Sequence, residues 1–122
     1  MKTIKFRGKR LANGEWCYGS LLVWADGECT ILEKSDSSNA VWKREIDPDT
    51  VGQFTGLTDA YGKEVYEGDL LRTPEQDIML VEWQDAKIIT KCVRPHNPHN
   101  VNSLTYAYPV SVVIGNIHDN PE

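Results

Sequence analysis

The sequence has few cysteines and no long apolar run. Cys17, Cys29 and Cys92 are an odd number, and no two of them form a CxxC pair. This usage favours a reducing, cytoplasmic setting without a disulfide framework. No stretch of about 18 uncharged apolar residues is present, which argues against a membrane-spanning helix. No apolar run of about 7 to 15 residues follows the charged start of the chain, which argues against a secretory signal.

An excess of positive charge is also missing. The 122 residues hold 13 Lys and Arg against 18 Asp and Glu, a net charge of −5, whereas nucleic-acid-binding proteins are usually basic. The charge is unevenly distributed, however. The first ten residues contain five bases and no acid, which leaves eight bases against eighteen acids, a net −10, on the other 112. The exclusion of nucleic acid is therefore weaker for the N-terminus than for the rest.

What the sequence has in abundance is period-two alternation broken by turn pairs, the pattern of short β-strands. Asn13-Gly14 and Asp26-Gly27 are strong hairpin signals. Asp47 followed by Pro48 predicts a single helical turn. The two prolines of residues 95–100 predict a loop tip. Strands are predicted at residues 3–10, 16–24, 29–33, 41–46, 64–66, 70–73, 78–83, 87–93, 104–108 and 110–117, and residues 53–57 are a short segment bounded by glycines.

Many short strands separated by turns predict a mostly β fold with little helix. We expect residues 1–122 to form a single compact domain. Residues 1–45 would be an N-terminal antiparallel meander and loop, packed beside a small β-barrel at 46–122. The strand number suits an SH3-like or an OB-like barrel.

A longer string is specific to a family. Residues 46–71 read IDPDTVGQFTGLTDAYGKEVYEGDLL, and they resemble the YopX family, small proteins encoded by phages, prophages and other mobile elements of bacteria. Residues 4–7, 16–19 and 113–122 are also similar to that family. The resemblance implies a largely β fold with an SH3-like barrel in a bacterial cytoplasm. It implies no particular biochemical activity.

Two groups of side chains carry metal-ligand chemistry. Glu64, Glu67 and Asp69 surround a glycine turn and could serve a metal-dependent hydrolase. Carboxylates that cap turns and face water are the favoured interpretation, because the spacing matches no EF-hand loop and no His or Cys lies nearby in the sequence. Cys92, His96 and His99 are zinc-ligand types at plausible spacing, but the prolines between them favour an exposed loop. We predict no cofactor and no metal, and leave these two groups as alternatives.

Lys5, Arg7 and Lys9 alternate along the first predicted strand, and four aromatic residues lie in the same third of the chain. Cations interleaved with aromatic rings suit single-stranded nucleic acid. Lysines that protect a sheet edge, or that pair with acids of the same protein, are the simpler interpretation.

We therefore predict a non-enzymatic binding or assembly module, with nucleic-acid binding as the alternative. A protein partner or a second copy is the expected partner, without a membrane or a small-molecule substrate. The candidate interaction surface consists of Lys5, Arg7, Lys9, Arg10, Asp59, Tyr61, Glu64, Glu67 and Asp69.

Overall fold

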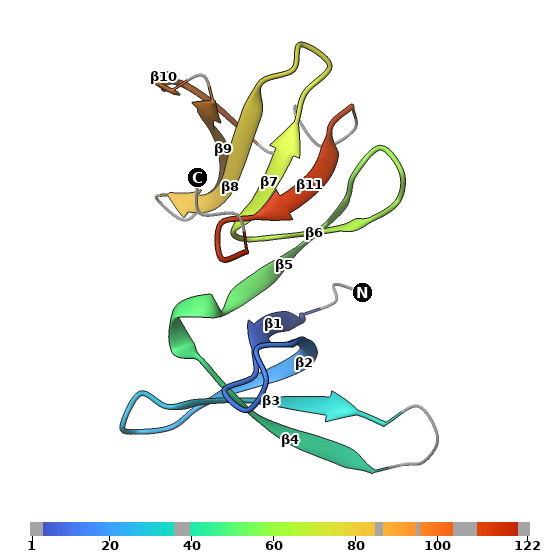
Figure 1. The fold of residues 1–122 in the computed structure, drawn as a ribbon, viewed down its shortest axis with the longest axis vertical. Coiled ribbons are helices and arrows are strands. Elements are labelled where there is room, and N and C mark those ends of the chain that lie inside the picture. The colour runs from blue at the N-terminus through green and yellow to red at the C-terminus, as the bar shows by residue number, and fades with distance from the viewer. Residues whose placement is uncertain (1–3, 36–39, 85–86, 95, 104–109, 120–122) are drawn as a thin grey trace. The chain divides into compact units, whose positions relative to one another are not determined.

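The fold is almost entirely antiparallel β, which confirms the predicted class (Figure 1). The computed structural model describes residues 4–35, 40–84, 87–94, 96–103 and 110–119. Its elements are β1 (Phe6–Lys9), β2 (Trp16–Val23), β3 (Cys29–Lys34), β4 (Val41–Ile46), the 3-10 turn η1 (Pro48–Thr50), β5 (Gly52–Thr58), β6 (Glu64–Tyr66), β7 (Asp69–Arg72), β8 (Ile78–Gln84), β9 (Lys87–Arg94), β10 (His96–Ser103) and β11 (Val112–Asn116).

The chain divides into two compact units, Met1–Phe54 and Thr55–Glu122, and β5 runs across the boundary. The sequence placed its boundary after residue 45 instead. That position lies inside the first unit, because the chain after β4 returns to β1. Asp47 donates its N–H to the Lys9 carbonyl, and Lys9 donates to the Thr50 hydroxyl at 2.8 Å.

The N-terminal unit is the predicted meander, with the sheet order β4-β3-β2-β1-β5. Asn13-Gly14 and Asp26-Gly27 form the first two hairpin turns, and both glycines have positive φ. At the second turn the Asp26 carboxylate accepts the Glu28 N–H at 3.0 Å. The core contains Cys17, Cys29, Ile31 and Ile46.

Glycine lets the backbones of this unit approach closely at Gly19, where β2 changes partner. Phe6 of β1 lies opposite Gly19, whereas the next residue, Ser20, lies opposite Leu32 of β3. A Cβ atom at Gly19 would lie 2.1 Å from the Leu32 carbonyl oxygen. This position therefore has no room for a side chain.

The C-terminal unit contains the last part of β5, which pairs with β6, and a second sheet in the order β10-β9-β8-β7-β11. Its core consists of Val65, Leu71, Met79, Val81, Cys92 and Val113. Within the described ranges this sheet is open, since no pairing joins β10 to β11. The closed SH3-like barrel is thus not confirmed.

Strand β10 differs from the predicted loop at residues 95–100. It pairs with β9 through His96, Asn97 and Val101, and the register shifts between Asn97 and Val101. Pro98 lies inside that irregularity, on a strand at the edge of its sheet. An edge bulge is where a residue without an N–H is tolerated, so Pro98 did not prevent a strand. The strand predicted at residues 104–108 lies outside the described residues.

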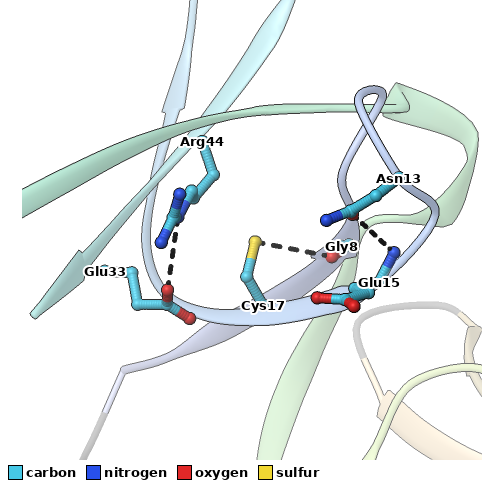
Figure 2. A network of polar contacts seen from close by, with 6 residues as sticks. All are labelled: Gly8, Asn13, Glu15, Cys17, Glu33 and Arg44. Atoms are coloured by element: carbon cyan, nitrogen blue, oxygen red, sulfur yellow. Dashed lines mark hydrogen bonds and ion pairs between the residues drawn. The ribbon is translucent and has the colours of Figure 1, made fainter.

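All three cysteines are buried thiols outside any disulfide, in line with the odd count. Figure 2 shows the Cys17 thiol directed at the Gly8 carbonyl oxygen, 3.6 Å away. Burial, with a smaller contribution from the Glu33 carboxylate, raises the pKa of Cys17 from 9.0 to about 11. Cys17 is therefore protonated at neutral pH and poorly nucleophilic.

We expect the three thiols to react with a disulfide reagent such as Ellman's reagent only after unfolding. At pH 8 the absorbance of released thiolate should stay low in buffer and reach three equivalents in guanidinium chloride. Rapid release from the native protein would contradict this.

Because the pKa of Cys17 is higher in the folded state, its contribution to stability is present below pH 9 and is lost as the pH rises towards 11. Urea unfolding of wild type and Cys17→Ala across that range measures the loss.

Candidate interaction surface

Three cationic side chains in and next to β1 lie over aromatic rings of the same unit. The Arg7 guanidinium carbon lies 4.6 Å from the centre of the Trp16 ring, and Lys9 Nζ lies 5.5 Å from the same ring. Lys5 Nζ lies 5.1 Å from the Phe54 ring. Arg7 is buried rather than exposed, while Lys5, Lys9 and Arg10 are half-buried. The alternation of cations and aromatics predicted in the sequence is thus real, but it stabilises the sheet itself.

Asp59 is buried and organises the turn between β5 and β6. Its Oδ1 accepts the N–H groups of Tyr61 at 2.8 Å and Lys63 at 2.9 Å, and its Oδ2 accepts the Val113 N–H at 2.9 Å. Burial alone would raise the pKa of this carboxyl. The three N–H donors, helped by the Lys63 charge, outweigh burial and lower the pKa below its ordinary 3.8. Asp59 therefore ties a turn to the last strand and does not face solvent.

Asp69 is likewise buried, and its carboxylate accepts the Tyr66 N–H at 2.7 Å. The Glu64 carboxylate accepts the Tyr66 hydroxyl at 3.1 Å, and Glu67 is half-buried. Tyr61, by contrast, is 82% exposed. Of the nine predicted surface residues, Arg7, Asp59 and Asp69 are thus interior: the Arg7 guanidinium stacks on Trp16, and the two carboxylates accept backbone N–H groups.

A groove that the sequence analysis did not predict lies on one face of strands β2, β3 and β4. Its volume is about 810 Å³. The register places Leu22, Thr30 and Glu45 side by side across the three strands, with Leu32 beside Lys43 in the next row. The groove is lined by Leu11, Leu22, Trp24, Asp26, Glu28, Cys29, Thr30, Leu32, Lys43, Glu45, Ile46 and Pro48.

Trp24 is the largest side chain of the groove and is about half exposed, at 51%. Its indole Nε1–H donates to the Thr30 hydroxyl at 2.9 Å, which fixes the ring across the hairpin. Leu22 and Leu11 are also exposed. The signal for this face was present in the sequence, since the unbroken apolar run of residues 21–25 leaves apolar side chains on both faces of a strand.

Comparison with known proteins agrees with this architecture. The YopX protein family matches residues 5–122, nearly the whole chain. The chain belongs to the YopX family. A solved structure, that of protein EF1440 from Enterococcus faecalis, aligns with all of this chain and 98% of its own, with 21% sequence identity and a TM-score of 0.61. That likeness concerns the fold. No curated protein matches the sequence.

In this YopX protein, the family-like string of residues 46–71 spans η1, β5, β6 and the start of β7. Its acids Asp47, Asp59 and Asp69 each accept backbone N–H groups at turns. The acids thus organise turns as predicted, but Asp59 and Asp69 are buried, so the expectation that they face water was wrong. Across the described residues, no group of three or more His, Cys, Asp and Glu side chains could hold a metal ion.

The second metal hypothesis concerned Cys92, His96 and His99. Cys92 is buried in the core of this YopX protein, and the side chains of the two histidines lie outside the described part.

Among the described residues, no helix is long and apolar enough to cross a membrane.

Proposed function

We propose that this YopX protein is a non-enzymatic binding or assembly module that contacts a protein partner through the groove on β2, β3 and β4. The observation that carries the proposal is the half-exposed Trp24 ring, held by Thr30 beside exposed Leu22 and Leu11. Fixed aromatic and aliphatic side chains in a concave surface are typical anchors of protein interfaces. A rigid sheet face of this kind binds without rearranging, which limits the entropy lost on association.

The family resemblance supports a setting in a bacteriophage or another mobile element, and the reduced, buried cysteines suit a bacterial cytoplasm. Five antiparallel strands, of which β7 to β10 follow one another in the sheet, support an SH3-like architecture for the second unit. The nucleic-acid alternative has less support, because the Arg7 guanidinium is buried on Trp16 and the groove is lined by more acids than bases.

Site-specific photo-crosslinking tests the proposed surface. We expect benzoylphenylalanine at Leu22, in the groove, to give discrete covalent adducts with a protein in cells that express the chain. The same group at Trp83, an exposed residue of β8 outside the groove, should give none of those adducts.

A second substitution, Leu32→Ser, controls for chance proximity. It changes the groove beside the crosslinker and should weaken the adducts formed from Leu22. An adduct of twice the chain mass would identify a second copy as the partner. Adducts that are absent at Leu22, or equal at Leu22 and Trp83, would refute the proposal.

A further inference from the structure

The groove has the chemistry of a receptor for a cationic side chain. We propose that it binds an extended, apolar segment of a partner protein through one arginine of that segment, which stacks on Trp24 between the carboxylates of the groove. This inference rests on the proposed function and adds the chemical class of the partner.

The first argument is the use of tryptophan in this unit. The charged groups of Arg7 and Lys9 lie over the Trp16 ring. The Arg44 guanidinium lies 4.8 Å from the centre of the Trp42 ring. Among the described residues, Trp24 has no such cation, although its ring is fixed by a hydrogen bond and half exposed. The negative face of an indole attracts a cation. A partner can supply to Trp24 the cation that the first unit places on its other two tryptophan rings.

The second argument is the charge of the lining. Asp26, Glu28 and Glu45 are exposed and line the same groove as Trp24, whereas Lys43 is the single base among the described residues that line it. None of these three carboxylates forms an ion pair within the described part of the chain. Arg44 of β4, next to Glu45 in the sequence, pairs instead with Glu33 of β3 at 3.4 Å, and neither of these two residues lines the groove (Figure 2). The groove is thus complementary to positive charge.

The third argument favours arginine over lysine as the bound cation and apolar residues as its neighbours in the segment. A guanidinium is planar, so it can stack on an indole and pair with a carboxylate at the same time, which an ammonium does less well. Leu11, Leu22 and Leu32 make the rest of the groove apolar. In an extended segment, side chains two residues apart point to the same face. Apolar side chains two positions before and after the arginine would therefore meet these leucines.

Binding of designed peptides to the full chain tests the inference. The probe is a capped heptapeptide of alternating leucine and threonine in which the central residue is arginine, lysine, citrulline or glutamate. Titrations are followed by NMR on the Trp24 indole N–H and by calorimetry. We expect saturable binding of the arginine peptide, about tenfold weaker binding of the neutral citrulline peptide, and no saturable binding of the glutamate peptide.

Matched variants locate the effect. The triple variant Asp26→Asn, Glu28→Gln, Glu45→Gln changes only exposed side chains and should bind the arginine and citrulline peptides equally. Trp24→Leu should weaken the arginine peptide about tenfold, whereas Trp83→Leu should leave its affinity unchanged.

Three outcomes would overturn the inference: no saturable binding of the arginine peptide at millimolar concentration, equal affinity of the wild type for the arginine and citrulline peptides, or an equal loss in the Trp24 and Trp83 variants. A lysine peptide that binds as tightly as the arginine peptide would overturn the choice of arginine. In each case, adducts at Leu22 in the crosslinking experiment would still support a protein-binding surface, so the two failures are distinguishable.

Discussion

Asp59→Asn is expected to lower the free energy of unfolding by about 3 kcal/mol. The asparagine oxygen can still accept the N–H groups of Tyr61 and Lys63, but its NH₂ group would face the Val113 N–H. Two donors would then meet in a buried place, and the bond between the β5–β6 turn and the last strand would be lost. Urea unfolding, followed by circular dichroism, measures the change.

The control is Asp26→Asn. Asp26 also accepts a backbone N–H, that of Glu28, but it is exposed and makes this bond with one oxygen. Asparagine can replace it there, so the change should stay within about 0.5 kcal/mol. If the two variants lost equal stability, the buried contact with Val113 would not be the cause.

The acid dependence of stability should change as well. The pKa of Asp59 is lower in the folded than in the unfolded chain, so the unfolded state takes up a proton first as the pH falls. The stabilisation by this carboxylate is therefore complete above pH 3.8 and is lost progressively below it. The asparagine variant should lack this component, and its difference from wild type should shrink at the lowest pH.

Gly19→Ala is expected to lower the free energy of unfolding by about 3 kcal/mol. The new Cβ would lie 2.1 Å from the Leu32 carbonyl oxygen and 3.0 Å from the carbon of the same group. Backbone atoms of a paired strand cannot rotate away as a side chain can. The pairing of β2 with β3 would have to separate locally, and the unfolding midpoint in urea should fall accordingly.

Gly14→Ala separates crowding from backbone strain. Gly14 has a φ of +72°, which an L side chain rarely adopts, but no atom lies within 4 Å of a Cβ built there. Its replacement should cost about 1 kcal/mol through strain alone. A Gly14 variant that is less stable than the Gly19 variant would contradict the close contact at Leu32.

The strands and turns of the first unit followed from local sequence, because hairpins are encoded by neighbours. Asn13-Gly14 and the 41–46 strand were predicted where they occur. The burial of Asp59 was not predictable in this way, because its Val113 partner is 54 residues distant. Composition marks an acid at a turn as exposed unless the far strand is known. The loop predicted around Pro98 was wrong for a similar reason, since only the sheet order shows that its strand lies at an edge.

The candidate site was harder to predict than the fold. The basic strand was correctly recognised as alternating, yet the sequence does not tell whether a cation stacks on its own ring or on a ligand. The opposite error occurred at Trp24, which was counted among the aromatic residues near the basic strand but was left out of the candidate surface. Its place in a groove depends on cross-strand neighbours such as Thr30 and Glu45, which only the register between β3 and β4 brings together.

The hydrogen bond from Val113 to Asp59 also bears on the order in which the chain folds. In the first unit, β1, β2 and β3 each pair with the strand that follows, and such local contacts form quickly. In the second unit, β11 pairs with β7, far back along the sequence. During synthesis, the N-terminal hairpins can therefore form before β11 has been made, and the sheet of the second unit cannot be completed until then. We therefore expect the carboxylate of Asp59 to stay solvated until then and to be buried late in folding.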